Sequence, residues 1–347
     1  MKILITTDWY SPAVNGVVTS VKNLRRGLEA RGHEVRILTL SQTTHSWTED
    51  GVTYLGSVPA GLVYPGARLR TPMVRRWTQE LVAWGPDVVH SQCEFSTFFL
   101  ARRIAEYLDV PLVHTYHTVY EDYTHYFSPS VRFGKKAVAM FSRWVAAQTD
   151  CLIAPTVKVR QLLQGYGISR PVFVVPSGID LDRFSGETDP IRQAVLRQSL
   201  DIPQEHLILV SVGRLAEEKN LEELLHLRAA MGEAPVTLLL VGGGPDKLRL
   251  EGIAAGLGLT APALCRADPC LAGVIREGEN GWQYRDREEF QQKLTEIRRQ
   301  PEQLAEMSAA ARRSMQTFSI HAFAEHMESI YLSQMAHHGG GRQEVSA

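Results

Sequence analysis

The fold is decided by a short stretch of the second half, LILVSVGRLAEEKNLEELL at residues 207–225. Residues 207–212 predict a buried strand, Gly213 predicts a turn, and a helical pattern begins after it. Arg214 and Lys219 lie between the strand and the helix. The backbone N–H groups of a helix start and two cations can hold an anion. The alternative is that two surface cations flank an ordinary turn.

Strand–turn–helix units also recur in the first half. Residues 3–5 predict a short buried strand, and apolar residues between 17 and 28 recur at helical spacing before a second strand at 33–40. A β-α-β unit implies a parallel sheet. Gly16 lies where the loop turns into the helix, so its missing side chain leaves room for a ligand near the helix N-terminus.

Length, charge and cysteine content limit the classes of protein to which this chain can belong. A chain of 347 residues predicts two domains, and its apolar runs are shorter than the roughly 18 residues that cross a bilayer. The four cysteines have no metal-ligand spacing, which favours a reducing cytoplasm. Residues 1–180 carry 19 Lys+Arg and 14 Asp+Glu, so the first half is positive and the second half is negative. This asymmetry favours an anionic partner for the first half, such as a membrane surface or a phosphate group, although ordinary surface variation is the alternative.

His117 follows the predicted strand at 110–116 and precedes a polar, aromatic run to residue 127. Ligand crevices form at the carboxyl ends of parallel strands. We therefore expect His117 to be a polar anchor or an acid/base group rather than a structural histidine.

A basic and aromatic helical pattern covers residues 131–145 and includes Lys135, Lys136 and Trp144. Such a helix can lie on an anionic membrane. A core-facing helix with a solvated basic side is the alternative. The cation-rich segment 68–77 supports the membrane interpretation, while the Gly- and Pro-rich residues 56–72 are typical of a loop.

Taken together, the motifs resemble those of the retaining GT-B glycosyltransferases of glycosyltransferase family 4. The resemblance covers nearly the whole length, and the run from Tyr116 to Phe127 is similar to bacterial enzymes that glycosylate diacylglycerol. The motifs are Asn15-Gly16-Val17, Pro176-Ser177-Gly178-Ile179-Asp180, Gly213-Arg214-Leu215, Glu218-Lys219-Asn220, Val241-Gly242-Gly243-Gly244-Pro245 and Glu279-Asn280-Gly281.

The resemblance implies an α/β GT-B fold, with two Rossmann-like domains facing across a cleft and the second domain shortened. It places the acceptor and membrane-side domain at 1–180 and the nucleotide-sugar domain at 190–317. A last helix at 318–335 would cross back to the first domain, and we expect residues 336–347 to be a disordered tail.

The resemblance also implies the chemistry. Arg214 and Lys219 would neutralise the donor diphosphate, so that no metal and no further cofactor are needed, and His117 would hold a sugar hydroxyl. The implied donor is a nucleotide-sugar, with UDP-glucose expected. The implied donor-binding residues are Asn15, Gly16, Val17, Gly213, Arg214, Lys219 and Gly243.

The implied acceptor is a lipid such as diacylglycerol, bound by a protein that lies on the inner face of the bacterial cell membrane. No nucleic-acid partner is implied. The implied acceptor and membrane residues are Tyr120, Glu121, Tyr123, Lys135, Lys136 and Trp144.

One departure from the family pattern concerns the donor site. The family has two glutamates, separated by seven residues, that grip the donor's ribose and sugar, and this chain lacks the pair. Glu277 and Glu279 do not have its spacing. We interpret the difference as an internal deletion near Thr260/Ala261, on the order of 50 residues. It predicts a shortened second sheet, exposed apolar faces and impaired activity.

Two alternatives to a lipid glycosyltransferase stay open. The chain could be a non-catalytic remnant that binds a lipid or a partner through its first domain. It could also be a soluble glycosyltransferase that acts on a sugar acceptor.

Overall fold

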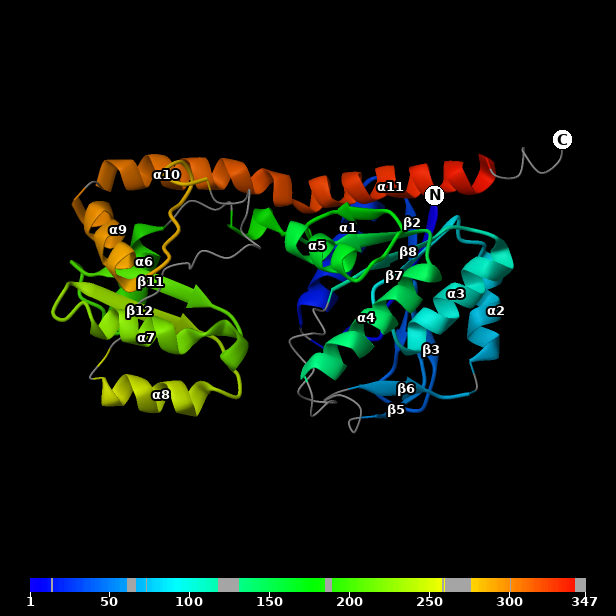
Figure 1. Cartoon of the computed structure of the whole chain (residues 1–347), viewed down its shortest axis with the longest axis horizontal. Coiled ribbons are helices and arrows are strands. Elements are labelled where there is room, and N and C mark those ends of the chain that lie inside the picture. The colour runs from blue at the N-terminus through cyan, green and yellow to red at the C-terminus, as the bar shows by residue number, and fades with distance from the viewer. Residues whose placement is uncertain are drawn as a thin grey trace. The chain divides into compact units, whose positions relative to one another are not determined.

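The computed structural model describes residues 1–13, 15–60, 67–72, 74–117, 131–184, 189–257, 259, 276–299 and 301–340. The chain divides into two compact units (Figure 1). Unit 1 consists of residues 1–184 and 315–347, and unit 2 consists of residues 185–314. The end of the chain therefore returns to the unit in which the chain begins.

Unit 1 is built on an eight-stranded sheet of order β10-β9-β8-β7-β1-β2-β4-β3, in which only β3 runs antiparallel to its neighbour. β1 lies near the middle because Ile3, Leu4 and Ile5 are apolar and fully buried, which covers both faces of the strand. The strands of this sheet are β1 (Lys2–Thr6), β2 (Glu34–Leu40), β3 (Trp47–Glu49), β4 (Val52–Leu55), β7 (Val88–Ser91), β8 (Leu112–Thr115), β9 (Cys151–Ala154) and β10 (Val172–Val174).

Helices connect these strands and cover the two faces of the sheet. α3 and α4 lie side by side on one face, joined by contacts of Trp144 with Phe98 and Phe99 (Figure 1). The helices of unit 1 are α1 (Gly16–Ala30), α2 (Arg75–Trp84), α3 (Ser96–Leu108), α4 (Val131–Ala147), α5 (Val157–Gly165) and α11 (Ile320–Gly340), with 3-10 turns at Leu181–Phe184 and Met315–Phe318.

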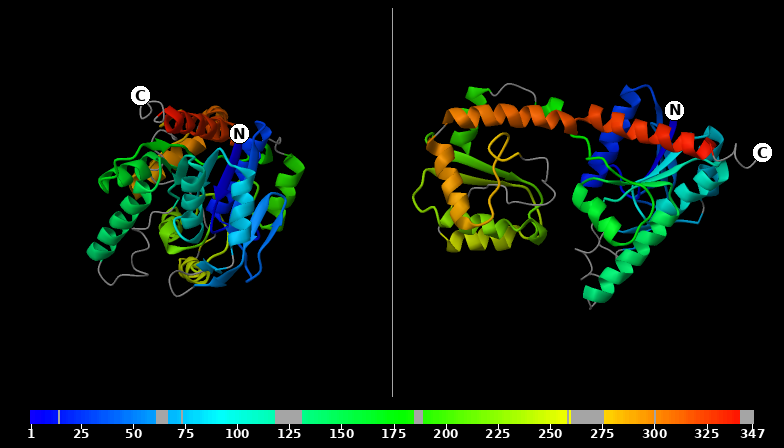
Figure 2. Two further views of the ribbon diagram at one scale, coloured as in Figure 1. Left: turned by 90° about the vertical axis from the view of Figure 1, so that its right-hand side faces the viewer. Right: turned by 45° about the horizontal axis from the view of Figure 1, so that its top comes forward.

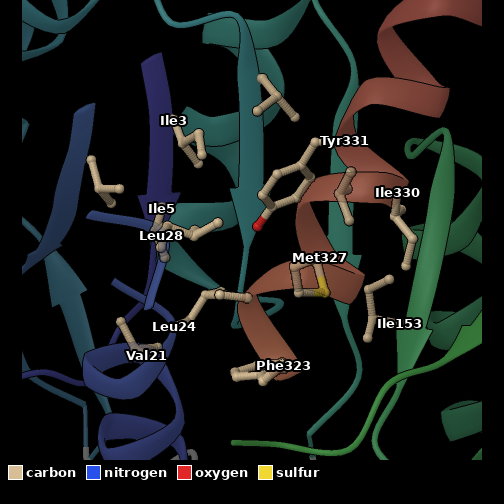
Figure 3. Close-up of a cluster of buried hydrophobic side chains, with 14 of the residues drawn as sticks. Ile3, Ile5, Val21, Leu24, Leu28, Ile153, Phe323, Met327, Ile330 and Tyr331 are labelled. Carbon is tan, nitrogen blue, oxygen red and sulfur yellow. The ribbon is translucent and has the colours of Figure 1, made fainter. Parts of the chain in front are cut away.

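The other face of the sheet is closed by α1 together with α11. Met327 and Tyr331 of α11 are fully buried against Ile5 and Leu24, as Figure 3 shows. The two helices cross closely, since a Cβ built on Gly27 would lie 2.9 Å from the backbone oxygen of Ile320. α11 is therefore part of the core of unit 1, and Figure 2 shows it lying beside α1.

α11 extends farther than the sequence predicts. It continues to Gly340, so residues 336–340 are helical rather than part of a tail. Its last turn is held by His338, whose ring lies 3.3 Å from a carboxylate oxygen of Asp109 and 3.6 Å from one of Asp150. Residues 341–347, where the rest of the tail was expected, lie outside the described residues.

The segment predicted as a loop at 56–72 contains an antiparallel hairpin of β5 (Ser57–Pro59) and β6 (Arg68–Arg70). Arg68 stabilises it by donating to the backbone oxygens of Ser41 and Gln42, at 3.1 and 2.9 Å, and to the Ser57 hydroxyl at 2.6 Å. Arg68 is thus a residue that stabilises this hairpin.

Unit 2 contains a small sheet, for which two parallel strands are described, β11 (Leu207–Val212) and β12 (Val236–Val241). The expected shortening of the second sheet agrees with this arrangement of the described residues. The helices are α6 (Pro190–Ser199), α7 (Leu221–Ala229), α8 (Lys247–Gly256), α9 (Arg287–Arg299) and α10 (Pro301–Ser314), with a 3-10 turn η3 (Glu217–Lys219) before α7.

One face of the β11–β12 sheet is exposed, as expected if units that normally cover it are absent. Val210 and Val212 point to the same face and are 52% and 77% exposed, and Val241, which pairs with Val212, is 42% exposed. α6 likewise buries none of its side chains. Unit 2 therefore presents apolar surface that a complete α/β domain would cover.

Candidate active site

Polar side chains gather at the carboxyl edge of the sheet of unit 1. Thr6 at the end of β1 is paired with Ser91 at the end of β7, and Ser91 is paired with His114 of β8. The residues that follow these strand ends are therefore brought to one edge, where ligands bind in open α/β sheets. Those with hydrogen-bonding or titratable side chains are Asp8, Gln92, Glu94 and His117.

His117 is half-buried at this edge, and its Nε2 lies 2.6 Å from Oε1 of Gln92. Burial lowers the pKa of His117 to about 4, while the negative charge of Glu94 acts in the opposite direction. The ring is therefore neutral near pH 7, and a neutral imidazole has one nitrogen that accepts a hydrogen bond. This geometry suits an anchor for a hydroxyl group.

Glu94 is 4% exposed, and its Oε1 lies 3.3 Å from Nε2 of the fully buried His114. A buried carboxylate is costly unless it is paired or hydrogen-bonded, so this position is built for a charged or proton-sharing group. The sequence interpretation missed both Glu94 and Gln92. The available signal was their place directly after the apolar residues of β7 (Val88–Ser91).

Asp8 ties the end of β1 to the start of α3. Its carboxylate accepts hydrogen bonds from the backbone N–H of Ser96 at 3.1 Å and of Thr97 at 2.8 Å, and from the Thr97 hydroxyl at 2.6 Å. Burial raises the pKa of Asp8 to about 6, and the bonds from Thr97 partly oppose that change. Asp8 thus caps α3 and fixes its first turn against the sheet edge.

The Asn15–Val17 motif forms the start of α1. Asn15 caps the helix, since its Oδ1 accepts from the backbone N–H of Val18 at 2.9 Å. A Cβ built on Gly16 meets no atom within 4 Å, so packing inside the protein does not require glycine there. An exposed glycine on an open helix start leaves room for a ligand to approach the backbone.

The glycine-rich turn after β12 fits closely against the turn after β11. The Gly213 N–H donates to the Val241 oxygen at 3.0 Å, which continues the strand pairing past the strand ends. A Cβ on Gly242 would lie 1.8 Å from the Gly213 oxygen, whereas one on Gly243 would meet no atom within 4 Å. Gly242 is therefore structural, and Gly243 is the glycine that faces open space.

The structure places Arg214 and Lys219 in exposed positions around this turn. We expected a helix to begin directly after these residues. Instead, the 3-10 turn η3 and Asn220, in a left-handed conformation at φ 47°, precede α7. The first turn of α7 already contains Glu222 and Glu223, which occupy the positive end of its dipole. The arrangement thus offers the two cationic side chains and the turn amides, rather than the start of α7, as groups that can meet an anion.

Of the predicted acceptor residues, Tyr120, Glu121 and Tyr123 lie outside the described residues. Lys135 and Lys136 are exposed on α4. Trp144 is 37% exposed.

Aromatic side chains of α3, of α4 and of Phe95, the residue before α3, form a partly exposed cluster, the aromatic patch, that the sequence interpretation did not find. Trp144 contacts Phe99 and stacks on Phe141, and Phe141 stacks on Phe95, with ring centroids 5.6, 6.1 and 6.0 Å apart respectively. The patch consists of Phe95, Phe99, Phe141 and Trp144.

Two absences hold for the described part of the chain. Its residues contain no group of three His, Cys, Asp or Glu side chains that could hold a metal ion. Within the same ranges, no helix is long and apolar enough to cross a membrane.

Comparison with known proteins gives several curated relatives, among them two synthases of the same name. Alpha-monoglucosyldiacylglycerol synthase of Streptococcus pneumoniae is 34% identical over 251 residues, which cover 71% of this chain and 56% of the relative. The synthase of the same name from Acholeplasma laidlawii is 27% identical over 389 residues, which cover 96% of this chain and 97% of the relative. The chain thus spans just over half of the first relative. The second alignment is longer than the 347 residues of this chain, so that relative contains segments with no counterpart here.

Family and fold comparisons agree with these relatives. Residues 14–183 match the family described as Glycosyltransferase Family 4. The crystal structure of a glycosyltransferase from Rickettsia africae ESF-5 superimposes with a TM-score of 0.69 and 14% identity, covering 96% of this chain and 98% of that one. In sequence the chain therefore resembles the monoglucosyldiacylglycerol synthases, its residues 14–183 match glycosyltransferase family 4, and its fold is that of the GT-B glycosyltransferases.

Proposed function

We propose that the chain transfers glucose from UDP-glucose to diacylglycerol at an anionic membrane surface, with retention of the anomeric configuration. The observation that carries this proposal is the neutral, half-buried His117 at the carboxyl edge of the unit 1 sheet. One nitrogen of the neutral ring accepts a hydrogen bond from a hydroxyl of the transferred sugar and so orients the reacting carbon.

The donor diphosphate is held by Arg214 and Lys219. Negative charge develops on the diphosphate as the bond to the sugar breaks, and two fixed cations stabilise that charge without a metal ion. Gly243 faces open space beside this turn, so a phosphate oxygen can approach its backbone N–H.

The missing glutamate pair makes the reaction slow. Glu277 is engaged by Lys293 and accepts from the Gln283 N–H at 2.9 Å, and Glu279 pairs with Arg276 at 3.0 Å. Neither carboxylate takes over the contacts to ribose and sugar. The chain keeps its phosphate contacts and loses the interactions that orient the rest of the donor.

The acceptor side is the exposed face of α4. Lys136, Met140 and Arg143 follow one another at helical spacing and are exposed, and Met140 is 64% exposed. A solvated basic face would not expose large apolar groups in this way. Mixed basic and apolar residues on one helix face are the pattern of an interfacial helix. The adjoining aromatic patch supplies rings that suit the lipid headgroup level.

Calorimetric titration tests the donor half of the proposal. UDP and UDP-glucose should bind with similar affinity, because the sugar contacts are lost, and GDP-mannose should bind no better than UDP. Changing Arg214→Ala together with Lys219→Ala should weaken UDP binding by about a hundredfold, since each lost charged hydrogen bond contributes about 1.5 kcal/mol or more. Arg192→Ala with Arg312→Ala, at exposed positions of α6 and α10, serves as the matched control.

A second candidate is a lipid-binding protein without catalysis. The observation that favours it is the contrast between the eight-stranded sheet of unit 1 and the exposed two-stranded sheet described for unit 2. No detectable binding of UDP, together with intact liposome binding, would establish this second function in place of the first.

A further inference from the structure

A chain of buried hydrogen bonds leads from the last helix to the candidate site. The Tyr331 hydroxyl of α11 lies 2.6 Å from Nδ1 of His90, and Nε2 of His90 lies 2.7 Å from the Thr115 hydroxyl. The side-chain nitrogen of Gln92 lies 3.0 Å from Nε2 of the same ring. The oxygen of Gln92 then contacts Nε2 of His117 at 2.6 Å. His90 and Tyr331 are fully buried, and Gln92 is 2% exposed.

The last hydrogen bond of this series, between His117 and Gln92, determines which ring nitrogen of His117 has the proton. An amide oxygen only accepts hydrogen bonds, so Nε2 of His117 must donate to Gln92. Because the ring is neutral, Nδ1 then has no proton and is a hydrogen-bond acceptor. No partner for Nδ1 is found among the residues that the structure describes.

We infer that Gln92 is a positioning residue that holds His117 in the Nε2–H tautomer, so that Nδ1 accepts the hydrogen bond of a substrate hydroxyl. The inference rests on the proposed function only for the identity of that hydroxyl. A histidine in the opposite tautomer would present an N–H to the substrate, and the hydroxyl would then have to accept rather than donate.

The neighbours of Gln92 explain why its amide keeps one orientation. Its nitrogen lies 3.0 Å from Nε2 of His90, and the ring of His90 also contacts the hydroxyl groups of Tyr331 and Thr115. Burial lowers the pKa of His90 well below its ordinary value, with the charges of His114 and His117 acting in the same direction. His90 is therefore a neutral, fixed ring, and the Gln92 amide is oriented by a rigid network rather than by solvent.

The groups that act electrostatically on His117 do not replace Gln92. Glu94 acts by charge and favours the imidazolium, and His114 acts by charge against it. Neither of these groups is hydrogen-bonded to the His117 ring among the described residues. Charge determines whether the ring is protonated, whereas a direct hydrogen bond determines where a single proton lies.

The direct test is nitrogen-15 NMR of the histidine rings in the full chain, with the His117 signals identified by their loss in His117→Gln. In the wild type, Nε2 should be the protonated nitrogen of a single tautomer. In Gln92→Leu, a second tautomer with the proton on Nδ1 should appear. Gln79→Leu, at an exposed glutamine of α2, is the matched control and should leave the signals unchanged.

Gln92→Glu separates positioning from folding. A carboxylate still accepts from Nε2, so the tautomer is kept, while the added charge raises the pKa of His117. Gln92→Leu should lower kcat/KM for sugar transfer by about tenfold, the size of one hydrogen bond, without changing the affinity for UDP. Gln92→Glu should restore kcat/KM only at pH values above the raised pKa.

A wild-type His117 that has its proton on Nδ1 would overturn the inference. So would a folded Gln92→Leu protein with an unchanged single tautomer. These outcomes are read without any sugar transfer. A protein that shows the expected tautomers but binds no nucleotide would therefore contradict the proposed function and leave the role of Gln92 intact.

Discussion

The exposed face of α4 offers a sharp test of the membrane proposal. Lys135 and Lys136 are neighbouring exposed cations on this helix. Changing both, Lys135→Glu with Lys136→Glu, reverses the charge of this face while leaving its buried residues, such as Val138, in place. The fold should be retained, because exposed charges contribute little to stability.

The expected loss follows from the number of charges reversed. Each lysine near an anionic bilayer contributes about 1 kcal/mol of attraction at moderate ionic strength. Replacing it with glutamate removes that attraction and adds a repulsion of the same order. Two reversals therefore weaken binding by about 4 kcal/mol, roughly a thousandfold in the partition constant.

Liposome flotation measures this difference. Wild type and variant are mixed with vesicles that contain either anionic or only zwitterionic phospholipid, at low and at high salt. Arg192→Glu with Lys247→Glu gives the same change of net charge at exposed sites in unit 2 and serves as the control. The wild type and this control should float with anionic vesicles at low salt, and added salt should reduce the difference between the variants.

Two results would refute the reasoning. Unchanged binding of the α4 variant would mean that the helix is not the contact surface. An equal loss in the unit 2 control would mean that net charge, rather than a particular face, drives association.

Three further predictions concern stability. Met327→Ala, at a fully buried position of α11, should lower the free energy of unfolding by about 2–5 kcal/mol, measured by urea unfolding with tryptophan fluorescence. Leu332→Ala, at a 51% exposed position of the same helix, should lower it by less than about 1 kcal/mol. Equal effects would contradict the core position of α11. Gly244→Ala should destabilise unit 2 by about 1–3 kcal/mol, because its Cβ would lie 2.1 Å from a backbone oxygen, while Gly243→Ala should keep stability and weaken UDP binding. Asp8 keeps its proton up to about pH 6 when folded and loses it near pH 4 when unfolded, so its contribution to stability falls as pH rises between these values. Asp8→Asn should remove this pH dependence of the unfolding free energy, which amounts to at most about 3 kcal/mol and to less after solvent screening. A variant whose pH profile in urea unfolding equals that of the wild type would contradict this prediction.

Local patterns were sufficient to predict the alternating strands and helices. β1 and β11 are short apolar runs that end at turn residues, and α1, the helix after β1, shows 3.6-residue periodicity, so neighbouring residues contain the necessary information. The hairpin of β5 and β6 was not predicted. Its position depends on Arg68, which bonds to backbone far along the chain.

The candidate site was predictable only in part for the same reason. His117 and Gly16 stand at strand-end and helix-start positions that the sequence reveals. Gln92 and Glu94 become neighbours of His117 and His114 only when β7 and β8 pair. Sequence periodicity gives no register between strands, so these contacts could not be derived from it.

The aromatic patch shows the same limit for surfaces. Phe95, just before α3, and Phe99 on α3 resemble core residues in sequence, and their exposure depends on how α4 packs against them. Trp144 was recognised because basic residues of its own helix surround it. A patch built from two helices needs their packing, which is a tertiary property.

Transfer of labelled glucose from UDP-glucose to diacylglycerol, in mixed micelles with anionic phospholipid, tests the central claim most directly. The account predicts α-glucosyldiacylglycerol formed at least about a hundredfold more slowly than by a complete relative, because charged hydrogen bonds to the donor are missing. The product should fall further in His117→Ala. Turnover at the rate of a complete relative, or a product that does not depend on His117, would contradict the account.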